Sequence, residues 1–74
     1  MRSYRFSVVI ERDQDGYFAF CPELEGCYTQ GDTYEEVLEN IRDAIWLHVI
    51  DRLEGGEEVP KAKSISITSL EVAV

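Results

Sequence analysis

The sequence predicts an α+β fold in which one main helix packs on a mostly antiparallel sheet, in the order β-β-β-α-β. Three observations predict it. Apolar side chains alternate near the start of the chain, glycines and a proline interrupt residues 13–31, and helical periodicity follows Thr33. The chain has 74 residues, so we expect residues 1–74 to form a single domain.

The first two strands are expected to form an antiparallel hairpin. Apolar and polar side chains alternate over residues 4–11, which is typical of a strand with one buried face. Asp13 to Gly16 forms a turn, and residues 17–21 form the second strand. Pro22 cannot donate a ladder hydrogen bond, so it ends that strand. Residues 27–30 are predicted to be a short third strand.

A capping box predicts where the helix begins. Thr33 is followed three residues later by Glu36, so the helix should start near Tyr34. Gly55 and Gly56 should end it. Helical spacing places one set of side chains on the face that packs on the sheet: Val37, Leu38, Ile41, Ala44, Ile45, His48 and Val49.

The last residues again alternate as a strand would. One or two final strands fit residues 65–74, with a bulge or turn at Ser69. The pattern leaves open whether this segment adds a strand to its own sheet or to a neighbour's sheet.

The net charge of the chain indicates which class of partner it could bind. The chain has 15 acidic and 7 basic side chains and a net charge of −8. Nucleic-acid binding needs a basic patch that replaces phosphate counterions, so we expect no direct nucleic-acid binding. The acidic balance favours a basic partner. Alternatively, it only keeps a small protein in solution.

No export signal or membrane span is expected. Two arginines occur in residues 1–6, but no apolar run follows them, and no apolar stretch is long enough to cross a bilayer. We therefore expect a cytoplasmic protein. In that reducing compartment Cys21 and Cys27 should be free thiols.

The sequence offers no persuasive catalytic set. A residual nuclease could use Asp13, Asp15, Asp32 or Glu36 with magnesium or manganese, but turns and helix starts favour these residue types anyway. The one histidine, His48, falls on the apolar helix face. It does not form a zinc site with the two cysteines, since such a site needs four well-spaced ligands. We expect no enzyme activity, no metal and no cofactor.

A second apolar surface is expected on the helix. Trp46, Leu47 and Ile50 lie in the same turns as the sheet-packing face, which makes this part of the helix apolar nearly all round. A chain of this size has a marginal core of its own. We therefore expect these three residues to form a homo-oligomer interface. The alternative is that the sheet wraps widely enough to cover them.

Three segments in order resemble one known family. They are Asp15–Ala19 (DGYFA), the loop Cys21–Cys27 (CPELEGC) and the helix start Gln30–Glu36 (QGDTYEE). Together they resemble the HicB-type antitoxins, in a short form without the C-terminal DNA-binding domain that many relatives carry. On that ground we expect no operator binding by this chain alone.

The resemblance implies a degenerate ribonuclease-H-like fold that has lost its catalytic carboxylates. It also implies an antitoxin of a type II toxin–antitoxin pair. The partner would be a small basic HicA-type toxin, a double-stranded-RNA-binding-like ribonuclease that cleaves mRNA with a histidine. The antitoxin would cover the active surface of that toxin. The alternative within the family is a solitary homo-oligomeric relative of unknown role.

Charge and expected exposure suggest where such a toxin would bind. The candidates are acids on the helix together with two residues of the loop after the second strand. The predicted partner-binding residues are Glu23, Leu24, Glu36, Glu39 and Asp43.

Overall fold

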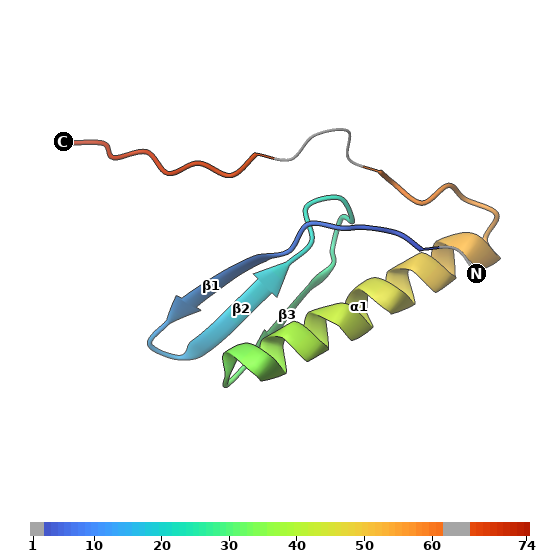
Figure 1. Cartoon of the computed structure of the whole chain (residues 1–74), viewed down its shortest axis with the longest axis horizontal. Coiled ribbons are helices and arrows are strands. Elements are labelled where there is room, and N and C mark those ends of the chain that lie inside the picture. Colours follow the sequence, from blue (N-terminus) through green and yellow to red (C-terminus); the bar gives the residue numbers. More distant parts are fainter. Residues whose placement is uncertain (1–2, 62–65) are drawn as a thin grey trace.

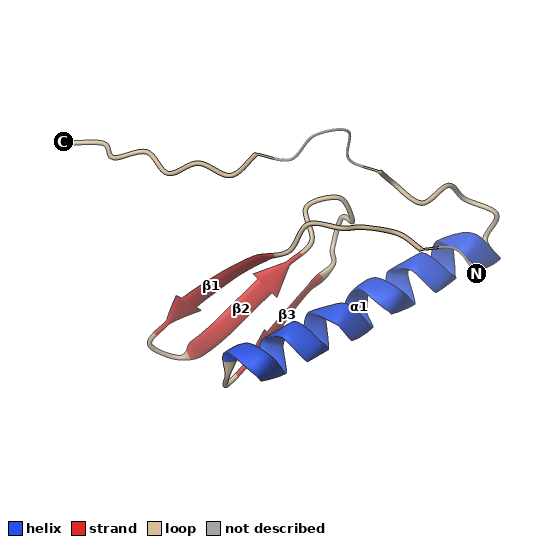
Figure 2. Cartoon of the chain, in the orientation of Figure 1, coloured by secondary structure: helices blue, strands red, loops and turns tan. Residues whose placement is uncertain are grey.

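The structure, a computed structural model, describes residues 3–61 and 66–74. It contains three strands and one helix: β1 (Val9–Asp13), β2 (Gly16–Phe20), β3 (Tyr28–Gly31) and α1 (Tyr34–Glu54). The strands form one antiparallel sheet in the order β1-β2-β3 (Figure 1). α1 lies along one face of this sheet, as Figure 2 shows. The predicted α+β class, with a helix on an antiparallel sheet, is therefore confirmed.

The β1–β2 hairpin closes through two residues, Gln14 and Asp15. The carboxylate of Asp13 accepts a hydrogen bond from the backbone N–H of Asp15 at 2.8 Å, which supports the turn. Gly16 follows with φ of 133°, a conformation that side chains disfavour. This position therefore requires glycine, and the predicted turn is confirmed.

The first strand begins later than predicted, at Val9 instead of Tyr4. Val9 pairs with Phe20, the last residue of β2, and the next residue, Cys21, already belongs to the loop. Residues 4–8 therefore have no β2 residue to pair with. The alternation of apolar and polar side chains predicts an extended conformation, but a strand also needs a hydrogen-bonding partner for its backbone groups.

Register divides the side chains of the sheet between two faces. Ile10 lies opposite Ala19 on the face toward α1, and Ala19 is fully buried there. Val9, Phe20 and Tyr28 lie opposite one another on the other face, which α1 does not cover. The core therefore lies between the sheet and the helix. Its buried residues are Ala19, Cys21, Leu24, Cys27, Val37 and Ile41.

The helix begins and ends as the sequence predicts. The side-chain oxygen of Thr33 accepts a hydrogen bond from the N–H of Glu36 at 3.0 Å, which caps the first turn. At the other end the N–H of Gly55 bonds to the carbonyl of Asp51. The predicted sheet-packing face is confirmed for Val37, Ile41, Ala44 and Ile45, which lie in or against the core. Leu38 is 38% exposed, and the packing of His48 and Val49 on the sheet stays a prediction.

The predicted last strand is absent from residues 66–74, and Ile65 lies outside the described residues. In Figure 1 this segment is an extended trace that stands apart from the sheet. Ile67, Leu70 and Val72 are 73%, 83% and 78% exposed. The alternation of side chains predicts an extended conformation, but in the described residues this segment pairs with no strand, and a strand needs a partner for its backbone groups.

Candidate partner-binding surface

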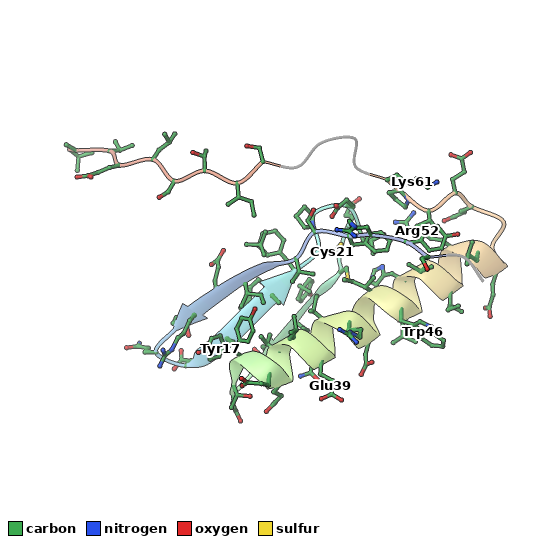
Figure 3. The ribbon with its side chains drawn as sticks, in the orientation of Figure 1. Tyr17, Cys21, Glu39, Trp46, Arg52 and Lys61 are labelled. Carbon is green, nitrogen blue, oxygen red and sulfur yellow. The ribbon has the colours of Figure 1, made fainter. Side chains whose placement is uncertain are left out.

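Three exposed acids lie along α1 outside its sheet-packing face. Val37 and Ile41 are buried against the sheet, and this orientation turns Glu39 and Asp43 outward. Glu36 is exposed on the flank of the helix, where it borders the hairpin end of the sheet. Figure 3 shows Glu39 projecting from the side of the helix away from the sheet. We call Glu36, Glu39 and Asp43 the acidic stripe.

Apolar side chains continue the same side of the helix beyond the acidic stripe. Trp46 and Leu47 are each 60% exposed, and Ile50 is half-buried. Figure 3 shows Trp46 on the same side of the ribbon as Glu39. The sheet therefore does not cover Trp46 and Leu47, and that alternative is wrong for these two residues. Their role in a homo-oligomer interface, with Ile50, stays a prediction.

Glu23 has a structural contact that the sequence did not suggest. Its carboxylate accepts hydrogen bonds from the backbone N–H of Ser7 at 3.0 and 3.2 Å and from the Ser7 hydroxyl at 2.7 Å. Burial alone would raise the pKa of this carboxyl, but the hydrogen bonds from Ser7 outweigh burial and lower the pKa below its ordinary value. Glu23 therefore ties its loop to the chain that precedes β1.

Leu24 is buried in the core. Only 1% of the residue is exposed, so it cannot belong to an exposed contact surface as predicted. The loop folds inward through its own backbone: the N–H of Leu24 bonds to the carbonyl of Cys21, and the N–H of Cys27 bonds to the carbonyl of Leu24. A proline and two acids in this loop predicted an exposed loop, but these hydrogen bonds turn its one large apolar side chain, Leu24, into the core.

The carboxylates of the nuclease alternative line one groove at the hairpin end of the sheet. Asp13, Asp15, Asp32 and Glu36 all border it. Asp13 already accepts the turn hydrogen bond from Asp15. Across residues 3–61 and 66–74, no three histidine, cysteine, aspartate or glutamate side chains lie close enough together to hold a metal ion.

Both thiols lie in the core. Cys21 and Cys27 are each 2% exposed and are free cysteines, as predicted. Burial raises the pKa of the Cys21 thiol to about 11, and it also raises the pKa of the Cys27 thiol. The reactive thiolate is therefore scarce at neutral pH in the folded chain.

An aromatic patch on the uncovered sheet face was missed at the sequence level. The ring of Phe18 lies beside the rings of Phe20 and Tyr28, with centroid distances of 6.2 and 6.1 Å. Phe18 and Tyr28 are 40% and 64% exposed. The signal was present, because Phe18 and Phe20 are two apart in a strand and so share a face. We call the face that carries Val9, Phe18, Phe20 and Tyr28 the outer sheet face.

In the part of the chain that the structure describes, α1 is too polar to cross a membrane, and no other helix occurs.

Comparison with known proteins decides the family. A family model described as "HicB_like antitoxin of bacterial toxin-antitoxin system" matches residues 6–72. The chain belongs to the HicB-like antitoxin family. Family membership supports an antitoxin role in a toxin–antitoxin system and suggests a non-enzymatic role.

Individual relatives agree with the family assignment. A UPF0150 protein of Helicobacter pylori strain J99 is 47% identical over 68 residues, which cover 90% of this chain and 93% of that protein. Antitoxin HicB 1 of Photorhabdus laumondii is 34% identical over 61 residues, which cover 81% of this chain and 39% of that antitoxin.

A solved structure shares the fold of this HicB-like antitoxin. A chain of a HicA3 and HicB3 toxin-antitoxin complex superposes with a TM-score of 0.64 at 19% identity. The match covers 82% of this chain and 72% of that chain. The ribonuclease-H-like assignment stays a prediction.

Proposed function

We propose that this HicB-like antitoxin neutralises a small basic, mRNA-cleaving toxin of the HicA type by covering its active surface. The observation that carries the proposal is the exposed acidic stripe on a chain of this family. A HicA3–HicB3 complex has the same fold in its matched chain, which supports a toxin as the partner.

The acids of the stripe are available to a partner. In the described part of the chain one salt bridge forms, between Arg52 and Glu57 at 3.8 Å, and it does not involve the stripe. The net charge of −8 adds a long-range attraction for a basic protein. A surface that binds RNA phosphates is basic, so carboxylates on a helix can occupy the same positions as phosphates.

The proposed contact surface is the acidic stripe, Glu36, Glu39 and Asp43. Trp46 and Leu47 follow these acids along α1, and both are 60% exposed. With Ile50 they stay the predicted homo-oligomer interface. Leu24 is not part of the contact surface, and Glu23 is committed to Ser7.

The test begins with the tagged chain purified from its own cells. A small basic protein in stoichiometric amount is expected, and that protein should cleave RNA when it is isolated. Adding the antitoxin back should stop the cleavage at about one equivalent of chain. Cleavage that continues in excess antitoxin would refute neutralisation. Recovery of the chain alone, in defined oligomers, would favour the solitary alternative.

A further inference from the structure

The segment of residues 66–74 has the side-chain pattern of a strand, but it pairs with no strand among the residues that the structure describes. Leu70, Val72 and Val74 are exposed by 83%, 78% and 122%, and they alternate with Ser69, Glu71 and Ala73. In a strand, these three apolar side chains would share one face. Exposed apolar rows of this kind are normally covered in a native assembly.

The same chain offers an open sheet edge. β1 is the outermost strand in the order β1-β2-β3, so one side of its backbone is unpaired among the described residues. α1 packs on β2 and β3 but not on β1, so the helix leaves this edge accessible. Edge strands with free N–H and C=O groups readily accept another strand.

The face of the sheet toward α1 supplies the matching apolar surface at this edge. Ile10 of β1, with Phe6 and Val8 before it, packs against the core, whereas the outer face of β1 carries Val9, Glu11 and Asp13. A fourth strand beside β1 would extend the row of Phe6, Val8 and Ile10 with Leu70, Val72 and Val74. Cross-strand pairs of aromatic and branched side chains are the pairs that stabilise sheets most.

The segment stands away from the body of its own chain. The radius of gyration is 14.3 Å, whereas a compact chain of this length has a radius of about 11 Å. Figure 1 shows residues 66–74 extending past the sheet without joining it. The family model nevertheless matches through residue 72, so most of this segment belongs to the shared domain.

We infer that residues 66–74 of one chain add a fourth strand to the β1 edge of a second copy, and that the second copy returns its own segment. In the described residues each chain carries this unpaired segment and the open β1 edge, so a two-fold pair satisfies both. The acidic stripe lies on α1, away from β1, so the pair would present two stripes to toxin. The inference therefore does not depend on the proposed function.

The mass of the full chain in solution tests whether two copies exchange residues 66–74. At micromolar concentration, light scattering should give twice the chain mass. Val72→Asp places a carboxylate in the apolar row and should halve that mass. Ala73→Asp makes the same charge change on the other face of the segment and should leave the pair intact. Circular dichroism should show both variants folded, because Val72 is 78% exposed and outside the core.

Amide hydrogen exchange identifies the edge that is used. Amides of Val9–Asp13 should exchange slowly in the pair and faster in Val72→Asp. Three results would overturn the inference: wild-type chain at single mass, equal mass for both variants, or β1 amides that exchange alike in the wild type and Val72→Asp. Single mass with protected β1 amides would instead mean that the segment closes its own sheet.

Discussion

Glu23 and Ser7 join two parts of the chain that the sheet does not connect. The Glu23 carboxylate accepts the N–H and the hydroxyl of Ser7, the hydroxyl at 2.7 Å. β1 begins only at Val9, so Ser7 has no ladder partner, and the loop carboxylate takes that place. A loop acid that the sequence suggested for toxin binding is therefore a structural link.

Glu23→Gln should destabilise the fold without changing its shape. The amide is neutral and offers a single oxygen as acceptor, so the charge-assisted bonds from Ser7 are weakened. We expect a loss of about 1 kcal/mol in the free energy of unfolding, measured by urea denaturation. Glu25→Gln, at an exposed position of the same loop, is the matched control and should change stability by less than about 0.5 kcal/mol. Equal losses in both variants would argue against the link.

The same carboxyl makes stability depend on pH. The pKa of Glu23 is lower in the folded chain than its ordinary value of 4.5. Its contribution is therefore complete at pH values well above 4.5, and it is lost as the pH falls through the folded pKa. Unfolding free energies measured between pH 7 and pH 3 should fall less steeply for Glu23→Gln than for the wild type. Parallel curves would show that other groups carry the acid sensitivity.

Gly31→Ala should disturb the packing of β3 against the start of α1. A Cβ atom at Gly31 would lie 2.8 Å from the backbone N of Val37, which is closer than packed atoms allow. We expect a loss of about 1–3 kcal/mol in thermal or urea unfolding. Gly55→Ala is the control, because its Cβ would be 3.4 Å from the nearest atom and its φ is −81°. A Gly31→Ala chain as stable as Gly55→Ala would contradict this close approach.

The two thiols should react only when the chain unfolds. Cys21 and Cys27 are 2% exposed, and burial raises the pKa of Cys21 to about 11, so little thiolate is present at pH 8. Iodoacetamide should label the native chain slowly and the urea-unfolded chain quickly. Mass spectrometry measures the number of labelled thiols per chain over time. Glu25→Cys adds an exposed thiol that should react at once in the native state. Rapid native labelling of Cys21 would contradict the described burial.

Local signals in the sequence were enough for the helix and the hairpin. The capping box of Thr33 and Glu36 and the glycine at residue 55 mark the bounds of α1 because caps act within one turn of the chain. The turn before Gly16 likewise depends on neighbouring residues only. The acids of the outward helix side follow from the same periodicity.

Features that depend on distant contacts were beyond the sequence. The role of Glu23 results from Ser7, 16 residues away, and Leu24 is buried in a core that the strands and the helix form together. The strand pattern of residues 66–74 describes a conformation but does not name the edge that pairs with it. The tertiary structure determines which strands pair, so the sequence alone does not predict the partner of this segment.

The affinity for toxin after charge reversal of the acidic stripe tests the central claim most directly. The stripe variant replaces Glu36, Glu39 and Asp43 with lysine. The control variant replaces three other exposed acids with lysine, namely Glu11, Glu25 and Glu58. Each variant has a net charge of −2, whereas the wild type has −8. At about 1 kcal/mol per reversed charge, the stripe variant should bind about 100-fold more weakly at low salt. The control should bind nearly as the wild type does, and the difference should shrink as salt is added. Equal affinity of the two variants would contradict the account.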